Sequence, residues 1–206
     1  MKQPILGVTM GDPAGVGPEI IARAGADAAV RRDSRPVVIG AASTMHAALT
    51  LVSSPLSVHT VKRVADCRWA DGTLEVLDLA NVDMQTLPRA AVSAAAGRAA
   101  YDYVERAVAL AQAREIDGIV TAPINKEALA AAGMPHTGHT EILARLSNTA
   151  DFAMLLMGHE LRVIHVTTHV ALRRVPDLVT RERVLKTIRL AQHTMQGLGR
   201  RDARIA

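Results

Sequence analysis

The chain of 206 residues has very few aromatic side chains: one tryptophan, two tyrosines and one phenylalanine make up 2% of it. Proteins that hold single-stranded nucleic acid stack its bases on aromatic rings, so this composition argues against that class. The net charge of +4 comes from arginines spread along the chain, with adjacent pairs at 31–32, 173–174 and 200–201. Scattered charges indicate a solvated surface, and we expect no nucleic-acid partner.

The sequence also lacks the marks of secreted and membrane proteins. Cys67 is the single cysteine, which excludes a disulfide within the chain and suits a reducing compartment. No apolar run reaches the roughly 18 residues that a membrane-spanning helix needs. The Gly-Asp-Pro sequence at 11–13 interrupts the first apolar run too early for a secretory signal. We therefore expect a cytoplasmic protein without a membrane partner.

Short apolar runs alternate with segments of helical periodicity, which predicts an α/β fold with a largely parallel sheet. Strands are expected at residues 5–10, 36–40, 56–62, 74–79, 116–121, 152–157 and 162–167, the last two forming a hairpin. Helices are expected at residues 18–30, 42–51, 91–115, 126–132, 139–147 and 180–196. Residues 203–206 resemble the start of a further strand, so we expect a chain that is truncated relative to its relatives.

Three small or sulfur-containing residue types give packing predictions. Gly97 lies inside a predicted helix, where glycine costs about 1 kcal/mol relative to alanine, and this predicts close packing against a neighbour. Met154 and Met157 are expected to fill the core. Cys67 is expected to be buried and inert, because no histidine pairs with it in a recognisable motif.

The densest group of hydrogen-bonding and ionisable side chains lies at residues 121–126 and 133–141, directly after a predicted buried strand. Loops at the carboxyl ends of parallel strands carry ligand chemistry in α/β proteins. His139 and Thr140 stand at a predicted helix start, where imidazole and hydroxyl donors suit a phosphate or carboxylate. Thr140 is also a candidate for the N-cap of that helix.

A second loop, at residues 11–17, has glycines at 11, 15 and 17, a spacing that matches neither the dinucleotide-binding nor the P-loop motif. Glycines at a helix start allow backbone N–H groups to approach an anion. Asp12 and Glu19 would repel a phosphate there. A tight strand-to-helix turn and an anion-binding loop both stay open.

His165 and His169 lie four residues apart, so on a strand they would point to the same face. A metal site is one interpretation, and a packed His165 with His169 at the strand end is the other. Val166 stands where the zinc-protease signature needs a glutamate. Two histidines alone do not make a metal site.

Four segments in order match one family: MGDPAGVGPEI at 10–20, TAPINKEAL at 121–129, GHTEILA at 138–144 and VIHVTTHVALRRV at 163–175. On these residues the chain resembles the 4-hydroxythreonine-4-phosphate dehydrogenases of pyridoxal phosphate and pyridoxine biosynthesis. The resemblance implies a three-layer α/β/α fold like that of isocitrate and isopropylmalate dehydrogenases. It places a first domain at residues 1–125 and part of a second at 126–206.

The resemblance also implies an oxidoreductase. Members of the family oxidise the secondary alcohol of a phosphorylated hydroxy acid with NAD, and the keto acid then loses carbon dioxide. A divalent metal (Zn²⁺, Mg²⁺ or Co²⁺) polarises the alcohol oxygen, and the protein is a homodimer. His139 and Thr140 match the pair that binds substrate, and His169 matches the first of three metal-binding histidines. The matched segments assign no catalytic or cofactor-binding residue.

Several alternatives remain at this point. The NKEAL form of the loop and the run at 163–175 also resemble the branch that acts on 4-phospho-threonate or 4-phospho-erythronate, and a third branch oxidises aromatic dihydrodiols. Asp12, Asn125 and Lys126 match motif positions near the cleft without a definite role. The competing classes are a non-catalytic fragment that at most binds an anion, and a metal-dependent hydrolase.

Overall fold

The computed structural model describes residues 3–83, 86–134, 138–158, 161–168 and 170–206. The chain divides into two compact units, unit 1 at residues 1–148 and unit 2 at residues 149–206. Within the described residues, no helix is both long enough and apolar enough to cross a membrane.

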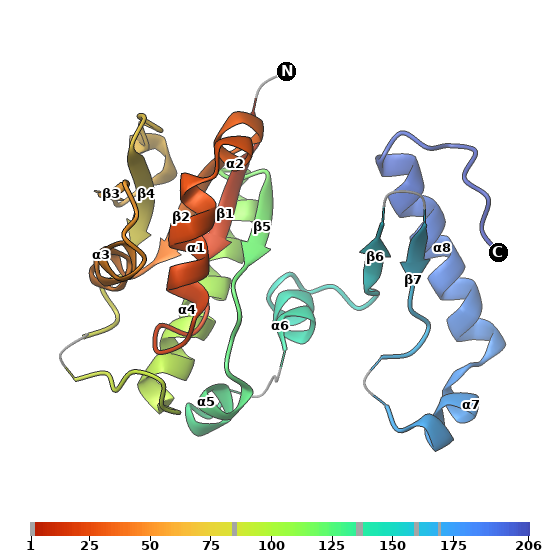
Figure 1. The fold of residues 1–206 in the computed structure, drawn as a ribbon. Coiled ribbons are helices and arrows are strands. Elements are labelled where there is room, and N and C mark those ends of the chain that lie inside the picture. The colour runs from red at the N-terminus through yellow and green to blue at the C-terminus, as the bar shows by residue number, and fades with distance from the viewer. Residues whose placement is uncertain (1–2, 84–85, 135–137, 159–160, 169) are drawn as a thin grey trace. The chain divides into compact units, whose positions relative to one another are not determined.

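A five-stranded parallel sheet forms the centre of unit 1 (Figure 1). Its strands are β1 (Ile5–Thr9), β2 (Arg35–Gly40), β3 (Ser57–Val61), β4 (Thr73–Asp78) and β5 (Gly118–Thr121). Their order across the sheet is β3-β4-β2-β1-β5, and every pair is parallel. The inner strand β2 carries Val37, Val38 and Ile39, all fully buried, as a parallel strand covered on both faces requires. The predicted parallel sheet is confirmed.

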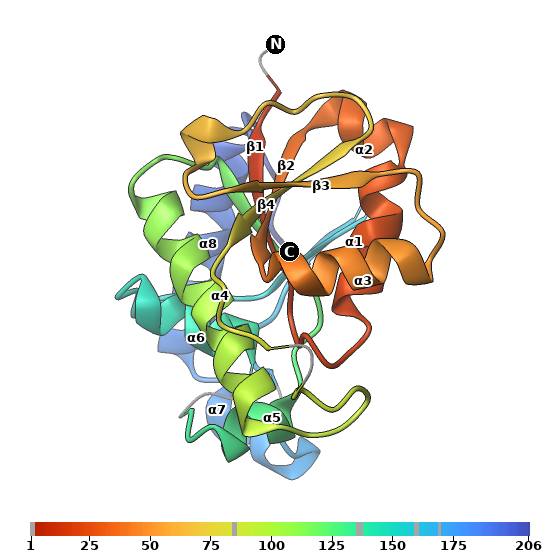
Figure 2. The same ribbon diagram turned by 90° about the vertical axis from the view of Figure 1, so that its left-hand side faces the viewer.

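Helices cover both faces of this sheet (Figure 2). The helices α1 (Gly17–Ala26), α2 (Ala28–Asp33) and α3 (Ala42–Leu51) lie on one face, and α4 (Ala94–Gln112) lies on the other. A short 3₁₀ turn, η1 (Val64–Asp66), joins β3 to β4. On α4, Tyr103, Val104 and Ala107 have no exposed surface, which is the apolar stripe expected of a helix that packs on a sheet. The α/β/α fold class is confirmed.

Two further helices pack against α4 in unit 1: α5 (Lys126–Ala131) and α6 (His139–Leu146). At Gly97, an added Cβ atom would lie 2.0 Å from the carbonyl oxygen of Ala128 in α5. The prediction of close packing at this glycine is therefore confirmed. Both helices belong to the first compact unit. The domain boundary expected after residue 125 stays a prediction.

Cys67 lies between η1 and β4 and is buried. Burial, with a smaller contribution from the nearby Glu75 carboxylate, raises the pKa of its thiol to about 12. A thiol with this pKa is protonated at neutral pH and is a poor nucleophile. The prediction of a buried, inert cysteine is confirmed.

The described residues of unit 2 form a hairpin and three helical segments. The strands β6 (Leu155–Met157) and β7 (Arg162–Ile164) pair antiparallel, which confirms the predicted hairpin. After them come η2 (Leu172–Arg174), α7 (Val175–Leu178) and α8 (Arg181–Gly197). The hydroxyl of Thr180 accepts the Arg183 N–H at 3.2 Å, so Thr180 is the N-cap of α8.

Two expectations for unit 2 are wrong. Met154 and Met157 are 36% and 55% exposed, because a two-stranded sheet offers too little surface to enclose its side chains. Residues 203–206 form no strand, since a strand needs a neighbour with which to pair its backbone groups.

Candidate functional site

The candidate site starts from the loops that follow β1 and β5, which are neighbours in the sheet. From β1 the chain proceeds to β2 on one side, and β5 later takes the place on the other side of β1. The strand order therefore reverses at β1. In open α/β sheets, ligands bind beyond the carboxyl ends of the strands at this kind of switch point. The two polar loops selected from the sequence meet at this position.

Backbone contacts join the two loops closely. The Ala122 N–H donates to the Thr9 carbonyl at 3.1 Å, and the Asp12 N–H donates to the Pro123 carbonyl at 2.9 Å. Gly11 has a φ of +72°, and an added Cβ atom there would lie 2.3 Å from the Pro123 oxygen. Only glycine tolerates both the left-handed backbone and this approach. The glycine at position 11 thus allows the two loops to lie against each other.

Asp12 organises the first loop rather than standing free in it. The side chain is 5% exposed, and its Oδ1 accepts the Ala14 N–H at 2.8 Å. The Asp12 carbonyl accepts the Gly15 N–H at 3.0 Å. Three N–H groups of this loop, at 12, 14 and 15, are therefore already paired within the protein. This pairing favours the tight-turn interpretation over the anion-binding loop, which needs free N–H donors.

The second loop ends at Asn125, the N-cap of α5. Its Oδ1 accepts the N–H groups of Glu127 at 2.9 Å and Ala128 at 3.1 Å, which satisfies two of the donors that a helix start leaves unpaired. Together the loops line an open cavity of about 610 Å³, whose wall is formed by Asp12, Gly15, Val16, Pro123, Ile124, Asn125, Lys126 and Glu127. Asp12, Asn125 and Lys126 thus lie at one cavity, and Asn125 has a structural role there that sequence analysis did not assign.

His139, the first residue of α6, contacts the loop after β5. Burial lowers the pKa of its imidazole, and a hydrogen bond to the Ala122 backbone partly opposes this shift. The Nε2 atom is buried and has no hydrogen-bond partner among the described residues. Buried polar nitrogens are normally paired, so this unpaired Nε2 makes His139 a candidate for ligand binding, and its substrate-binding role stays a prediction. Sequence analysis did not find the Ala122 partner, because a backbone carbonyl leaves no signature in a side-chain pattern.

Thr140 is the second residue of α6, and the residue before the helix is Gly138. The prediction that Thr140 caps this helix is therefore wrong: the extended backbone of Gly138, with φ of −149°, ends the loop earlier. Thr140 is partly buried beside His139. The substrate-binding role of Thr140 stays a prediction. His136, in the same polar segment at 133–141, lies outside the described residues.

The metal site expected at His169 lies outside the described residues. His165 follows β7, and its backbone N–H donates to the Met154 carbonyl at 3.1 Å while its Nδ1 lies 3.4 Å from the same oxygen. Among the described residues, no group of three or more His, Cys, Asp or Glu side chains could hold a metal ion. The metal-binding role of His169 stays a prediction.

Comparisons with known proteins show the family of the chain. Residues 32–206 match the model of the family described as pyridoxal phosphate biosynthetic protein PdxA. The chain belongs to the PdxA family. It is 43% identical over 196 residues to a D-threonate 4-phosphate dehydrogenase of Cupriavidus necator, covering 95% of this chain and 59% of that protein. A D-threonate 4-phosphate dehydrogenase of Pectobacterium atrosepticum is also 43% identical, and this match covers 98% of this chain and 62% of that protein.

The same family appears among solved structures. The crystal structure of a 4-hydroxythreonine-4-phosphate dehydrogenase from Burkholderia phymatum superposes with a TM-score of 0.89 at 40% identity. That match covers 97% of this chain and 60% of the other. The PdxA chain described here therefore spans about three-fifths of the length of the relatives that it matches.

Proposed function

We propose that this chain takes part in the NAD-dependent oxidation of D-threonate 4-phosphate, a phosphorylated hydroxy acid, with loss of carbon dioxide from the keto acid. The observation that carries the proposal is the 43% identity to relatives of that name over nearly the whole chain. The position of the polar loops at the switch point of the sheet supports it, because this is where α/β proteins bind ligands.

His139 is the residue whose chemistry fits such a substrate best. Its lowered pKa keeps the imidazole neutral at physiological pH. A neutral imidazole that donates its N–H to a carbonyl carries a lone pair on the other ring nitrogen. The unpaired Nε2 can then accept a hydrogen bond from a substrate hydroxyl. In this proposal His139 orients the secondary alcohol, and Thr140 and Lys126 supply donors for anionic groups of the same substrate.

A divalent metal and NAD are part of the proposed reaction, but the described residues do not provide a set of ligands for either. Those residues contain no cluster of three metal-ligating side chains, and a metal ion in a catalytic site needs about three protein ligands. The loop at 11–17 has its N–H groups at 12, 14 and 15 paired internally, so it does not fit a cofactor phosphate.

A homodimer is the second part of the proposal, with unit 2 as the contact surface. Unit 2 exposes several large apolar side chains on the hairpin and on the segment after it: Leu156, Met157, Leu161, Val163 and Leu172. Leu172 is 86% exposed. Large exposed apolar side chains, where they gather into a patch, are typical of protein–protein contacts. Sedimentation velocity tests this part, and a monomer at micromolar concentration would contradict it.

The activity test mixes the purified protein with NAD, a divalent metal and each candidate substrate, and follows NADH by its absorbance. We expect turnover with D-threonate 4-phosphate and a higher kcat/KM for it than for 4-hydroxythreonine 4-phosphate. The second substrate is included because the related solved structure carries that name. Turnover of neither substrate, by a protein shown to be folded, would support the non-catalytic alternative.

A further inference from the structure

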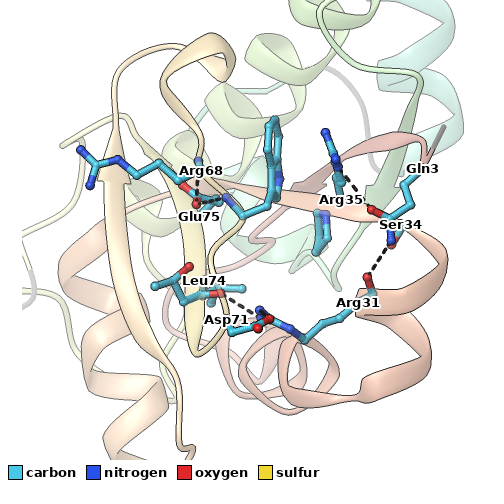
Figure 3. Close-up of a pocket in the computed structure, with 11 residues that line it drawn as sticks. Gln3, Arg31, Ser34, Arg35, Arg68, Asp71, Leu74 and Glu75 are labelled. Atoms are coloured by element: carbon cyan, nitrogen blue, oxygen red, sulfur yellow. Dashed lines mark hydrogen bonds and ion pairs between the residues drawn. The ribbon is translucent and has the colours of Figure 1, made fainter.

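A second polar pocket lies at the opposite edge of the unit 1 sheet, at the amino ends of β2 and β4 (Figure 3). Its volume is about 200 Å³, and it is lined by Gln3, Arg31, Ser34, Arg35, Pro36, Arg68, Trp69, Asp71, Thr73, Leu74 and Glu75. This volume is below the roughly 300–1,000 Å³ of pockets for drug-sized ligands. An occupant of this pocket would be a small molecule or an ion.

Most charged side chains around the pocket already have hydrogen-bond or ion-pair partners within the protein. Arg31 donates to the carbonyls of Thr73 and Ala70, at 3.0 Å each. Both carboxylate oxygens of Glu75 are also used: Oε1 accepts the N–H groups of Arg68 and Trp69, and Oε2 lies 2.6 Å from the His59 Nδ1. The remaining acid, Asp71, is fully exposed at the rim, 3.8 Å from Arg31.

Arg35 differs from these residues, because its charge is not paired with a carboxylate of the described residues. Its Nε donates to the Gln3 Oε1 at 3.3 Å, and its guanidinium carbon lies 5.2 Å from the centre of the Trp69 ring. Its two Nη atoms have no acceptor among the described residues, and no carboxylate there pairs with it. A partly buried arginine without an anionic partner is uncommon, because a desolvated charge costs free energy unless it is paired.

The wall beside Arg35 is held in place independently of any ligand. Trp69 has a φ of +48°, and its N–H donates to Glu75 at 2.7 Å. Glu75 is 2% exposed, so the anchor is fixed in the interior. The indole Nε1 is buried and unpartnered among the described residues. Figure 3 shows the Arg68 guanidinium pointing away from Arg35, so Arg68 does not add a second cationic group beside Arg35.

We propose that this pocket is a second binding site, for the oxyanion group of a small phosphate or carboxylate compound, with Arg35 as its principal ligand. The planar guanidinium presents two parallel N–H groups, which match two oxygens of a phosphate or carboxylate. The indole ring beside it excludes water and strengthens these bonds. The site lies at the edge of the sheet away from the loops of β1 and β5, so it is separate from the proposed substrate site.

Trp69 makes the proposal directly testable, because it is the single tryptophan of the chain. We expect inorganic phosphate, titrated at constant ionic strength, to change its fluorescence with saturation. Two charge-assisted hydrogen bonds predict half-saturation on the order of 1 mM. Acetate is titrated in parallel: saturation with both supports an oxyanion site, and saturation with phosphate alone supports a phosphoryl site.

Variants separate binding at this pocket from general charge effects. We expect Arg35→Gln to weaken binding at least about tenfold. Arg23→Gln, which removes an exposed arginine of α1, and His139→Asn, at the proposed substrate site, should leave the response unchanged. If Arg35→Gln does not fold by circular dichroism, Arg35→Lys decides instead, since an ammonium group cannot make the paired bonds and must also weaken binding.

Two results would overturn the proposal. One is the lack of a saturable Trp69 response in folded wild-type protein up to on the order of 50 mM phosphate and acetate. The other is an unchanged response in the folded Arg35 variant. Neither result affects the proposed dehydrogenase function, which is measured by NADH formation.

Discussion

The two compact units differ sharply in how they bury apolar side chains. Unit 1 encloses large residues such as Tyr103 and Leu77 on both faces of its sheet, whereas the buried residues in the described part of unit 2 are Thr187, Ala191 and Met195, all on α8. Large apolar side chains of the unit 2 hairpin remain exposed. Unit 1 therefore holds its own core and can fix the loops of the candidate site, while the described part of unit 2 encloses no large aliphatic or aromatic cluster.

The same deletion in the two units should show this difference most strongly. Leu77→Ala removes a side chain that is 1% exposed, and we expect the free energy of unfolding to fall by about 2–5 kcal/mol. Leu172→Ala removes one that is 86% exposed, and we expect a change within about 0.5 kcal/mol. Urea denaturation of both variants measures this. Equal losses would contradict the view that unit 2 lacks a core of its own.

Glycine-to-alanine substitutions, which add a methyl group, also compare the packing of the two units. Gly97→Ala would force a Cβ atom against the Ala128 carbonyl, and we expect a loss of about 1–3 kcal/mol. Gly197→Ala at the end of α8 meets no atom within 4 Å, and we expect a gain of up to about 1 kcal/mol from reduced backbone entropy. Thermal unfolding compares the two variants, and a stabilising Gly97→Ala would refute the close α4–α5 contact.

Helix caps give a smaller, matched test. Asn125 caps α5 in unit 1, and Thr180 caps α8 in unit 2. Removal of either cap by alanine should cost about 1 kcal/mol. Because Asn125 also lines the cavity at the candidate site, we expect Asn125→Ala alone to reduce substrate binding, as measured by calorimetry. Equal substrate affinity in both variants would separate α5 from that site.

The smallest expected effect is a pH dependence from His139. Burial lowers the pKa of this imidazole below its ordinary value of 6.5. As the pH falls below 6.5, the His139 imidazole of the unfolded chain binds a proton before that of the folded chain does. The contribution of neutral His139 to the free energy of unfolding is therefore complete above that pH, and it is lost as the pH falls through the pKa of His139 in the folded chain. Urea midpoints measured across this range should fall less steeply for His139→Asn than for the wild type. Parallel pH profiles would show that burial does not shift this group.

Local sequence signals predicted the elements of unit 1 well, and their failures have local causes. The helix at 42–51 has the observed bounds of α3. The single helix expected at 18–30 is in fact two, because Asp27 accepts the N–H groups of Ala29 and Val30 and starts α2. This cap was readable in the sequence. The failure at Thr140 has a different cause: no side chain caps α6, and the extended backbone of Gly138 decides where the helix begins.

The candidate site was only partly predictable, because its assembly depends on contacts between distant residues. The sequence identified the polar loops and His139, but the adjacency of β1 and β5 follows from a strand order that local patterns do not contain. Among the described residues, the unpaired Nε2 of His139 and the unpaired Nη atoms of Arg35 depend on which donors and acceptors the fold brings near them. Unmet hydrogen bonds are properties of the folded chain.

We propose above that the His139 Nε2 accepts a hydrogen bond from a hydroxyl of a phosphorylated hydroxy acid. Calorimetric titration of D-threonate 4-phosphate into the wild type, His139→Asn and His46→Asn tests it most directly. Asparagine at 139 can keep the bond to the Ala122 backbone but has no atom at Nε2, and His46 on α3 is bonded to the Ala42 carbonyl instead. We predict that His139→Asn weakens binding at least about tenfold while His46→Asn does not. The same affinity in all three proteins would contradict the claim.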